Sequence, residues 1–150
     1  LLTIADMSVI EAEVEVDEET GAVRVKKLTT AHNTGTILNP STHQGQIDGA
    51  VVMGFGYGVI ENLAYDESGK VLAANLGEYK IPNIQDIPEL RTAIIQSDFG
   101  SGPYNSMSIG ETALIPTAAA IANAIEDAIG VRIKSLPITA EKVLNALKGR

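Results

Sequence analysis

The sequence contains no cysteine, and its positive charges are too few to balance its negative ones. Its 150 residues include 11 lysines and arginines against 19 aspartates and glutamates, which gives a net charge of −8. Without cysteine, this chain forms no disulfides and supplies no thiolate ligands to zinc or iron–sulfur clusters. Without a clustered excess of lysine and arginine, it is not expected to bind nucleic acid or an anionic membrane surface.

Long apolar runs are also absent, because glycines, glutamates and asparagines interrupt every candidate. None reaches the roughly 18–20 residues that a membrane-spanning helix needs. The first residues, LLTIADMSVIEAEVEVDEE, do not begin with methionine and have no basic region or cleavage site typical of a signal peptide. We therefore expect a fragment of a longer protein, no membrane insertion and a cytoplasmic location.

The chain is 45% hydrophobic, which is enough to build a core, and its patterns mix strands with helices. Residues 9–17 and 22–32 alternate apolar and polar side chains, which predicts an antiparallel hairpin. A second hairpin is expected around the turn at 66–69, and a further strand at 89–99. The segment 77–90 contains two prolines and is predicted to be a traversing loop.

Three helices are expected. The first begins with Asn39 as N-cap and Pro40 at the first helical position. The second covers 111–130, is apolar nearly all round and ends at Gly130. The third follows the N-cap Thr139. The fold class is therefore α+β, with an antiparallel-leaning mixed sheet packed by helices in two layers.

The first of these helices is unusually rich in glycine, at positions 45, 49, 54, 56 and 58. Each glycine in a helix interior costs roughly 1 kcal/mol relative to alanine, so something should offset the cost. The close approach of a ligand or of another backbone would do so. Tight packing between two helices is the alternative, and the sequence favours neither.

Glu111, in the stretch SIGETALIP, is the first candidate for chemistry. A Gly/Ser-rich loop delivers it to the start of an apolar segment, and Gly110 permits close approach of the backbone to a ligand. A buried carboxylate at this position would have the raised proton affinity of a general base. The alternative is a first-turn glutamate placed there only by the helix dipole.

The remaining polar candidates give weaker signals. Gln44 and Gln46 lie in the first turns of the glycine-rich helix, where an amide can both donate to and accept from a heterocycle, although a solvated helix end is the usual setting of a lone glutamine. His32 and His43 are the only histidines. A metal pair is the alternative, but we expect each of them to be hydrogen-bonded within the fold or exposed. No metal ligands are predicted.

Three blocks of the sequence together resemble a known family. They are NTGTILNPSTHQGQIDGAVVMGFGYGVIENL, GEYKIPNIQDIPEL and GPYNSMSIGETALIPTAAAIANAIEDAIGVRI. Their order and spacing are similar to the C-terminal part of the molybdopterin-binding subunit of the xanthine dehydrogenase/aldehyde oxidase family. The resemblance covers residues 8–147 and makes residues 1–150 a C-terminal molybdopterin-binding domain fragment of a larger subunit.

The resemblance implies a molybdenum hydroxylase, which hydroxylates a heterocycle or aldehyde carbon with oxygen from water. In its IGE motif the general base falls on Glu111, next to Gly110, and in GQIDG the pterin-contacting glutamine falls on Gln46. The complete enzyme would carry a molybdenum–pterin cofactor, with iron–sulfur clusters and FAD on other domains or subunits. Its partners would be a small-molecule substrate, the rest of the molybdenum subunit and the iron–sulfur and flavin proteins.

The sequence also departs from the family pattern, because GPYNSMSIGE replaces the frequent GPFGAKGVGE. Asn105 stands where glycine is common, and Met107 where lysine is frequent. These changes leave two alternatives open: a non-catalytic binding or scaffold module that retains the fold, and an unrelated α+β regulatory domain. As an isolated fragment, the chain is expected to be inactive and to self-associate through apolar surface that other domains normally cover.

Overall fold

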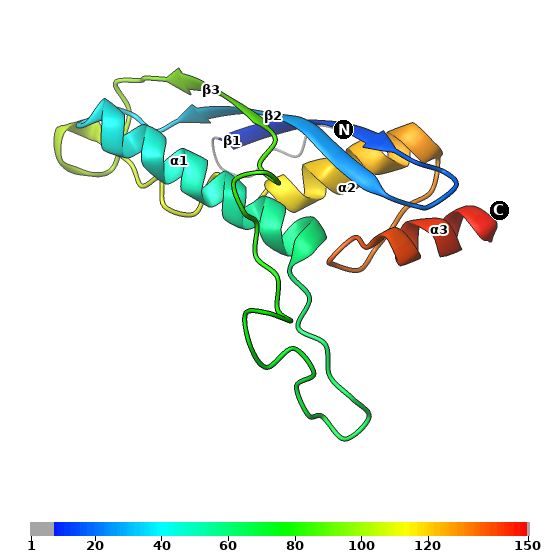
Figure 1. Ribbon diagram of the computed structural model, residues 1–150. Helices are drawn as coiled ribbons and strands as arrows, with labels where there is room; N and C mark the ends of the chain where they lie inside the picture. Colours follow the sequence, from blue (N-terminus) through cyan, green and yellow to red (C-terminus); the bar gives the residue numbers. More distant parts are fainter. Residues whose placement is uncertain (1–7, 150) are drawn as a thin grey trace.

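The computed structural model describes residues 8–149, and it begins with the predicted hairpin (Figure 1). Strand β1 (Ser8–Val16) pairs antiparallel with β2 (Val23–Asn33), and a bulge lies between Glu13 and Val14. The connecting turn is stabilised by the Asp17 carboxylate, which accepts a hydrogen bond from the Glu19 N–H at 2.9 Å. The predicted hairpin is therefore confirmed to within one residue at each end.

Strand β3 (Glu89–Ile95) confirms the third predicted strand, although it ends four residues earlier than expected. It lies beside β2 and parallel to it, with Lys27 opposite Glu89. The sheet order is β1-β2-β3, with one antiparallel and one parallel pair, so the mixed sheet was predicted correctly but its antiparallel bias was wrong. The reason is the long crossover through helix α1, because parallel neighbours need such a connection.

Helix α1 (Pro40–Phe55) begins as predicted: the Asn39 side chain accepts a hydrogen bond from the Thr42 N–H at 3.2 Å. It continues directly into a π-helical turn, η1 (Gly56–Ile60). Helix α3 (Ala140–Lys148) also has its predicted cap, with Thr139 Oγ1 accepting from the Lys142 N–H at 3.3 Å. Short polar side chains at N-caps thus identified both helix starts.

Helix α2 (Thr117–Ile129) ends as predicted at Gly130, whose φ of 70° is left-handed. Its start was predicted wrongly, because residues 110–116 form turns and the helix begins six residues after Glu111. Pro116 explains the difference. A residue before proline is disfavoured in the α conformation, so the helix cannot run back through Ile115.

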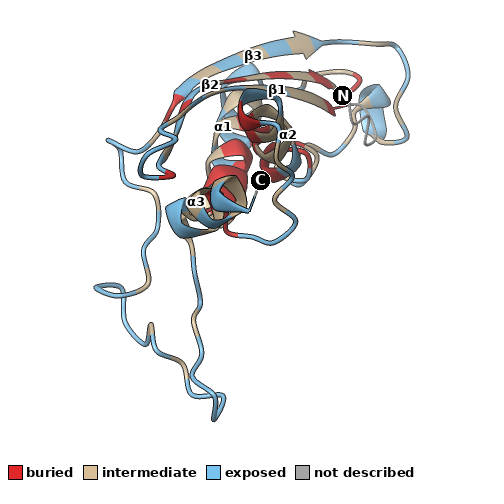
Figure 2. Ribbon diagram, turned by 90° about the vertical axis from the view of Figure 1, so that its right-hand side faces the viewer, coloured by how far each residue is buried: buried red, intermediate tan, exposed pale blue. Residues whose placement is uncertain are grey.

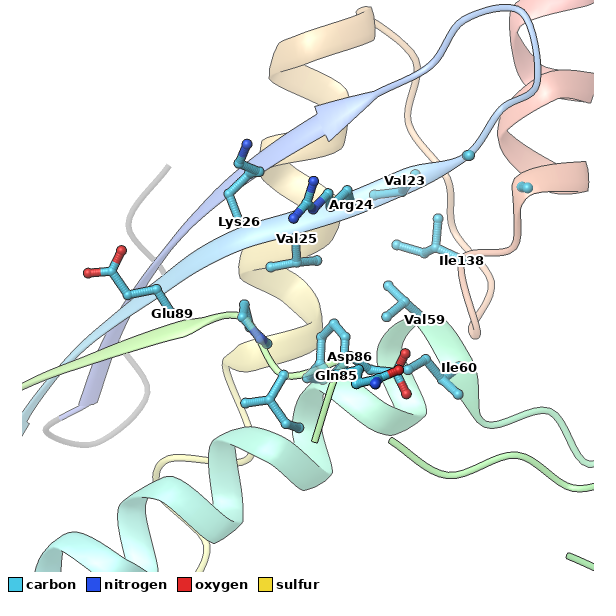
Figure 3. A pocket seen from close by; sticks show the side chains of 15 residues that line it. Val23, Arg24, Val25, Lys26, Val59, Ile60, Gln85, Asp86, Glu89 and Ile138 are labelled. Atoms are coloured by element: carbon cyan, nitrogen blue, oxygen red, sulfur yellow. The ribbon is translucent and has the colours of Figure 1, made fainter. Parts of the chain in front are cut away.

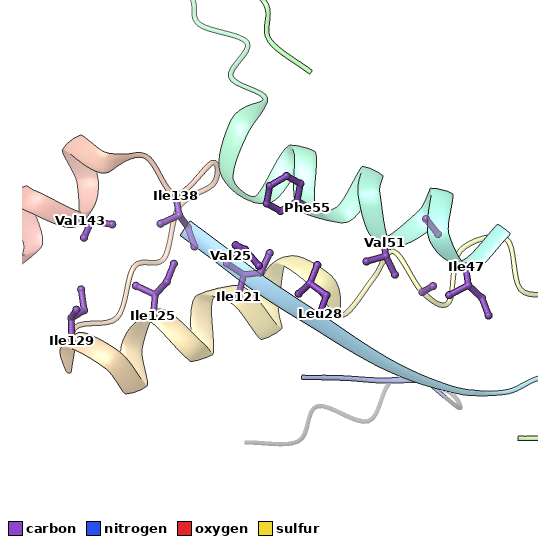
Figure 4. Close-up of a cluster of buried hydrophobic side chains, with 12 residues drawn as sticks. Val25, Leu28, Ile47, Val51, Phe55, Ile121, Ile125, Ile129, Ile138 and Val143 are labelled. Atoms are coloured by element: carbon purple, nitrogen blue, oxygen red, sulfur yellow. The ribbon is translucent and has the colours of Figure 1, made fainter. Parts of the chain in front are cut away.

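The core lies between the sheet and the helices. Helices α1 and α2 lie on the same side of the sheet, and α2 packs mainly against β1 (Figures 1 and 2). The buried apolar side chains come from β2, α1 and α2 and from the C-terminal segment, as Figure 4 shows: Val25, Leu28, Ile47, Val51, Phe55, Ile121, Ile125, Ile129, Ile138 and Val143. This rigid core fixes where α1 and the start of α2 present their outer faces.

The predicted second hairpin did not form as strands. A single β-bridge joins Tyr65 to Val71, and residues 61–88 otherwise have no strand or helix. The segment leaves the end of η1, extends away from the body and returns to β3 (Figures 1 and 2). We call residues 61–88 the arm. Its returning half, which ends at residue 88, corresponds to the traversing loop predicted at 77–90.

Candidate functional site

The segment that carries Glu111 is attached at its first end to the exit of β2. The Met107 N–H donates to the Thr34 carbonyl at 3.0 Å, and the Thr36 N–H donates to the Asn105 carbonyl at 3.0 Å. Gly35 lies between them with a φ of 66° and forms a bridge with Ser106. A side chain at Gly35 would collide with the Asn105 carbonyl, so the close approach of these two backbones requires glycine.

The second end of the segment is attached to the C-terminal half of α1 and to η1. The Tyr57 hydroxyl donates to the Leu114 carbonyl at 3.3 Å, and burial raises the pKa of Tyr57. A Cβ at Gly54 would lie 2.6 Å from Thr117 Cβ, and the Thr117 hydroxyl donates to the Ala113 carbonyl at 2.8 Å. Figures 1 and 4 show the segment running along α1 to the start of α2.

Between these two attachments, Glu111 lies in a turn rather than at a helix N-terminus. Its carbonyl accepts hydrogen bonds from the Leu114 N–H at 3.0 Å and the Ile115 N–H at 3.3 Å. Its side chain is exposed, and so is Gly110. Within this chain, Glu111 is therefore not the buried carboxylate that a general base at this position was expected to be: the backbone is held in place, but the side chain is exposed.

Gln46 lies on the exposed side of α1, with Gly45 and Gly49 beside it at helical spacing. A Cβ added at Gly45 or at Gly49 would meet no atom of the described chain within 4 Å. The two glycines are thus not required by the packing of this chain. By contrast, Gly54 and Gly58 pack against Thr117 and Ala118, where the tight helix contact that was the alternative explanation does hold.

Gln44 is held by hydrogen bonds within the fold. Its side-chain amide donates to Asp48 Oδ1 at 2.8 Å and to Thr92 Oγ1 at 2.9 Å, which ties α1 to β3. No hydrogen bond joins Gln46 to Glu111 within residues 8–149. The structure therefore places the two predicted site residues on separately anchored elements, α1 and the turn before α2, and leaves both exposed.

Both histidines are held within the fold, as expected. His32 is fully buried, with Nδ1 2.7 Å from Ser8 Oγ, and its pKa is lowered by burial and, less strongly, by His43. His43 Nε2 lies 3.2 Å from Thr34 Oγ1, and burial lowers its pKa. Among the residues that the structure describes, no group of three or more potential ligands could hold a metal ion.

Thr34 is a site-positioning residue that sequence reasoning missed. Its hydroxyl contacts His43 on α1, and its carbonyl accepts from Met107 in the segment leading to Glu111. This buried residue therefore joins the helix that carries Gln46 to the loop that carries Glu111. The only sequence signal is its place before Gly35, which marks a backbone turn but not a contact.

Replacing Thr34 with valine should loosen this junction. The substitution keeps the shape but leaves His43 without its partner, which costs about 1–3 kcal/mol. We expect amide hydrogen exchange at residues 105–110 and in the first turns of α1 to rise by about tenfold or more. Thr34→Ser, which keeps the hydroxyl, should exchange like the wild type. Equal protection in the valine variant would show that the contact does not hold the loop.

Three cavities in the described part of the chain lie elsewhere. One of about 560 Å³ is bordered by the start of β2, by η1 and by the segment 85–89, with Ile138 on its wall (Figure 3). Two others, of about 710 and 410 Å³, lie between β1 and α2 and along the arm. None of Gln46, Gly110 and Glu111 lines any of them, so within this chain the predicted site is an open surface.

In the part of the chain that the structure describes, none of the helices combines the length and the apolar character that crossing a bilayer requires.

Comparison with known proteins identifies the family of the chain. Residues 5–88, more than half of the chain, match the family model described as molybdopterin cofactor-binding domain. The chain is 38% identical over 122 residues to the xanthine dehydrogenase molybdenum-binding subunit of Escherichia coli O157:H7, covering 81% of this chain and 16% of that protein. It is 37% identical over 137 residues to the aldehyde oxidoreductase molybdenum-binding subunit of Escherichia coli K12, covering 90% of this chain and 19% of the relative.

The similarity extends to solved three-dimensional structures. The aldehyde oxidoreductase from Desulfovibrio gigas superposes with a TM-score of 0.86 at 36% identity, over 94% of this chain and 15% of that one. The chain thus spans less than a fifth of the length of each of these three proteins. The family description supports the predicted molybdenum–pterin cofactor, and the names of the relatives support the predicted class of molybdenum-dependent oxidoreductases.

Proposed function

Because this chain belongs to the family of molybdopterin cofactor-binding domains, we propose that it is the C-terminal part of a molybdenum hydroxylase subunit. In that enzyme it would supply Glu111 as the general base and Gln46 as a contact to the pterin. The observation that carries the proposal is the pair of glycines that flank Gln46 on the outer side of α1. The substrate class would be a heterocycle or an aldehyde, as the names of the relatives suggest.

The residues on this surface fit the cofactor. Gly45 and Gly49 lower the stability of helix α1. No packing inside the chain requires them, because a Cβ at either position would meet open space. A flat heterocycle lying against the helix backbone would account for both. Gln46, exposed beside them, has an amide that can donate and accept along the edge of such a ring. Gly110 likewise has no atom within 4 Å of an added Cβ, so its backbone is open to close approach.

When bound, the cofactor supplies the oxygen that is transferred and accepts the electron pair that leaves the substrate carbon. The part of this chain in that reaction is to hold and move a proton. Glu111 would take the proton from the attacking hydroxyl group through its carboxylate oxygen. The two attachments of its segment, at Thr34 and at Tyr57, hold the backbone that carries Glu111 in place relative to α1.

The exposure of Glu111 in this chain has a consequence for the complete protein. Closing an active site expels water, which strengthens the electrostatic interactions inside it. Other parts of the protein must therefore cover the Glu111 side chain when substrate is bound. Electrons would then leave through iron–sulfur clusters and FAD on other domains or subunits.

The experiment that tests the proposal is a measurement of molybdenum and pterin in the complete protein, purified without oxygen from a host that makes the cofactor. We expect close to one molybdenum for each copy of the chain. A correctly folded protein without molybdenum would instead favour the non-catalytic binding or scaffold module, and Glu111 would then be an ordinary surface glutamate.

A further inference from the structure

The arm, residues 61–88, is largely exposed to solvent. It connects the end of η1 at Ile60 to the start of β3 at Glu89 and projects from the body, as Figures 1 and 2 show. None of residues 61–87 is buried. Connections of this length without regular structure are uncommon in compact domains and usually have a function.

The arm differs from a solvated linker in its composition. Six of its large apolar side chains are exposed, and Ile84 is the most exposed of them at 88%: Leu63, Tyr65, Leu72, Leu76, Ile81 and Ile84. Segments that remain solvated are poor in such residues. Gathered on one projecting element, they are typical of a surface that another protein surface covers.

Hydrogen bonds from the arm's own polar side chains also hold it in a defined conformation. The Asp66 carboxylate accepts from the Ser68 N–H at 2.8 Å and the Lys70 N–H at 3.0 Å, and Asn75 Oδ1 accepts from the Gly77 N–H at 2.8 Å. The Tyr79 hydroxyl donates to Glu61 Oε2 at 2.7 Å and so ties the outgoing half of the arm to the returning half. Such local order lowers the entropy that binding must overcome.

The charge of the arm restricts what can cover it. It carries five acidic residues and two basic ones, a net charge of −3: Glu61, Asp66, Glu67, Glu78 and Asp86 against Lys70 and Lys80. A second arm carries the same net charge of −3 and is therefore not the complementary surface. The complementary surface is apolar and bordered by lysine or arginine side chains.

We infer that the arm docks into such an apolar, basic-rimmed surface on another part of the same polypeptide. The family match covers residues 5–88, so the whole arm lies within the matched part of the chain. The molybdenum-binding subunits that resemble this chain are about five times its length, which leaves ample polypeptide to form that surface. The inference rests on the proposal that this chain is part of a longer subunit, but it does not depend on the roles proposed for Glu111 and Gln46.

Site-specific photo-crosslinking in the complete protein tests the inference. The photoreactive residue p-benzoylphenylalanine would replace Ile84 in one variant and Leu76 in a second, with the exposed, acidic Glu67 of the same arm as the control position. After irradiation of a mixture of isotopically heavy and light protein, mass spectrometry identifies the joined peptides and shows whether both belong to one molecule.

We expect both apolar positions to join peptides outside residues 1–150 of the same molecule. Their yield should exceed that of the control by about tenfold, because docking holds the groups at the millimolar effective concentration of an intramolecular contact. Three results would overturn the inference: cross-links to a second copy, cross-links to a different polypeptide, or yields at both positions no higher than at Glu67.

Discussion

Replacing Glu111 with glutamine in the complete protein is expected to lower kcat/KM by about 100- to 10,000-fold, the range that a positioned general base contributes. The amide occupies nearly the same volume and cannot take up the proton. Because the backbone of residues 110–116 is held by the Tyr57 contact and the turn hydrogen bonds, the variant should fold normally. Its molybdenum and pterin contents should equal those of the wild type.

A second glutamate provides the control for this substitution. Glu141 is exposed in the first turn of α3, at the C-terminal end of the chain and far in sequence from the proposed site. Glu141→Gln removes the same charge and should leave both turnover and cofactor content unchanged. Turnover of Glu111→Gln at the wild-type rate, with cofactor present, would remove the general-base role while leaving the cofactor surface on α1 untouched.

Replacing Gly49 with leucine should instead weaken cofactor binding. The new side chain would project into the space beside Gln46 that no atom of this chain occupies. Overpacking a contact by this amount costs about 1–3 kcal/mol, so the affinity for the pterin should fall by about 10- to 100-fold. The fold should be retained, because leucine is the better helix former by about 1 kcal/mol.

A substitution at Gly54, on the same helix, is the control that distinguishes loss of cofactor binding from loss of folding. A Cβ at Gly54 would lie 2.6 Å from Thr117 Cβ, so Gly54→Leu should lower the yield of folded protein itself. Molybdenum and pterin content, measured for each milligram of folded protein, distinguishes the two variants. Wild-type cofactor content in Gly49→Leu would mean that the pterin does not approach α1 at this turn.

Local sequence signals predicted most of the secondary structure. The hairpin, both N-caps and the C-cap at Gly130 depend on residues close to one another in the chain, and all were found where expected. The parallel placement of β3 was not predicted, because a long arm separates it from α1 and hides the strand–helix–strand pattern. The late start of α2 could have been predicted, since Pro116 already marks the boundary.

The candidate site could likewise be predicted from the sequence only in part. The sequence pattern identified Gln46, Gly110 and Glu111 as candidates, and their roles remain predictions. It could not distinguish glycines that pack against α2, such as Gly54, from those that face open space, such as Gly49, because that depends on which face of α1 the core covers. Nor could it reveal that Thr34 links the two elements, since that contact requires the folded backbone.

The most direct test of the proposed cofactor site is an anomalous difference map, recorded at the molybdenum absorption edge from crystals of the complete protein. We expect one strong peak facing the Glu111 carboxylate, with the pterin lying over Gly45 and Gly49 and contacted by the Gln46 amide. A peak remote from the turn at 110–116, with the outer side of α1 covered by protein alone, would contradict it.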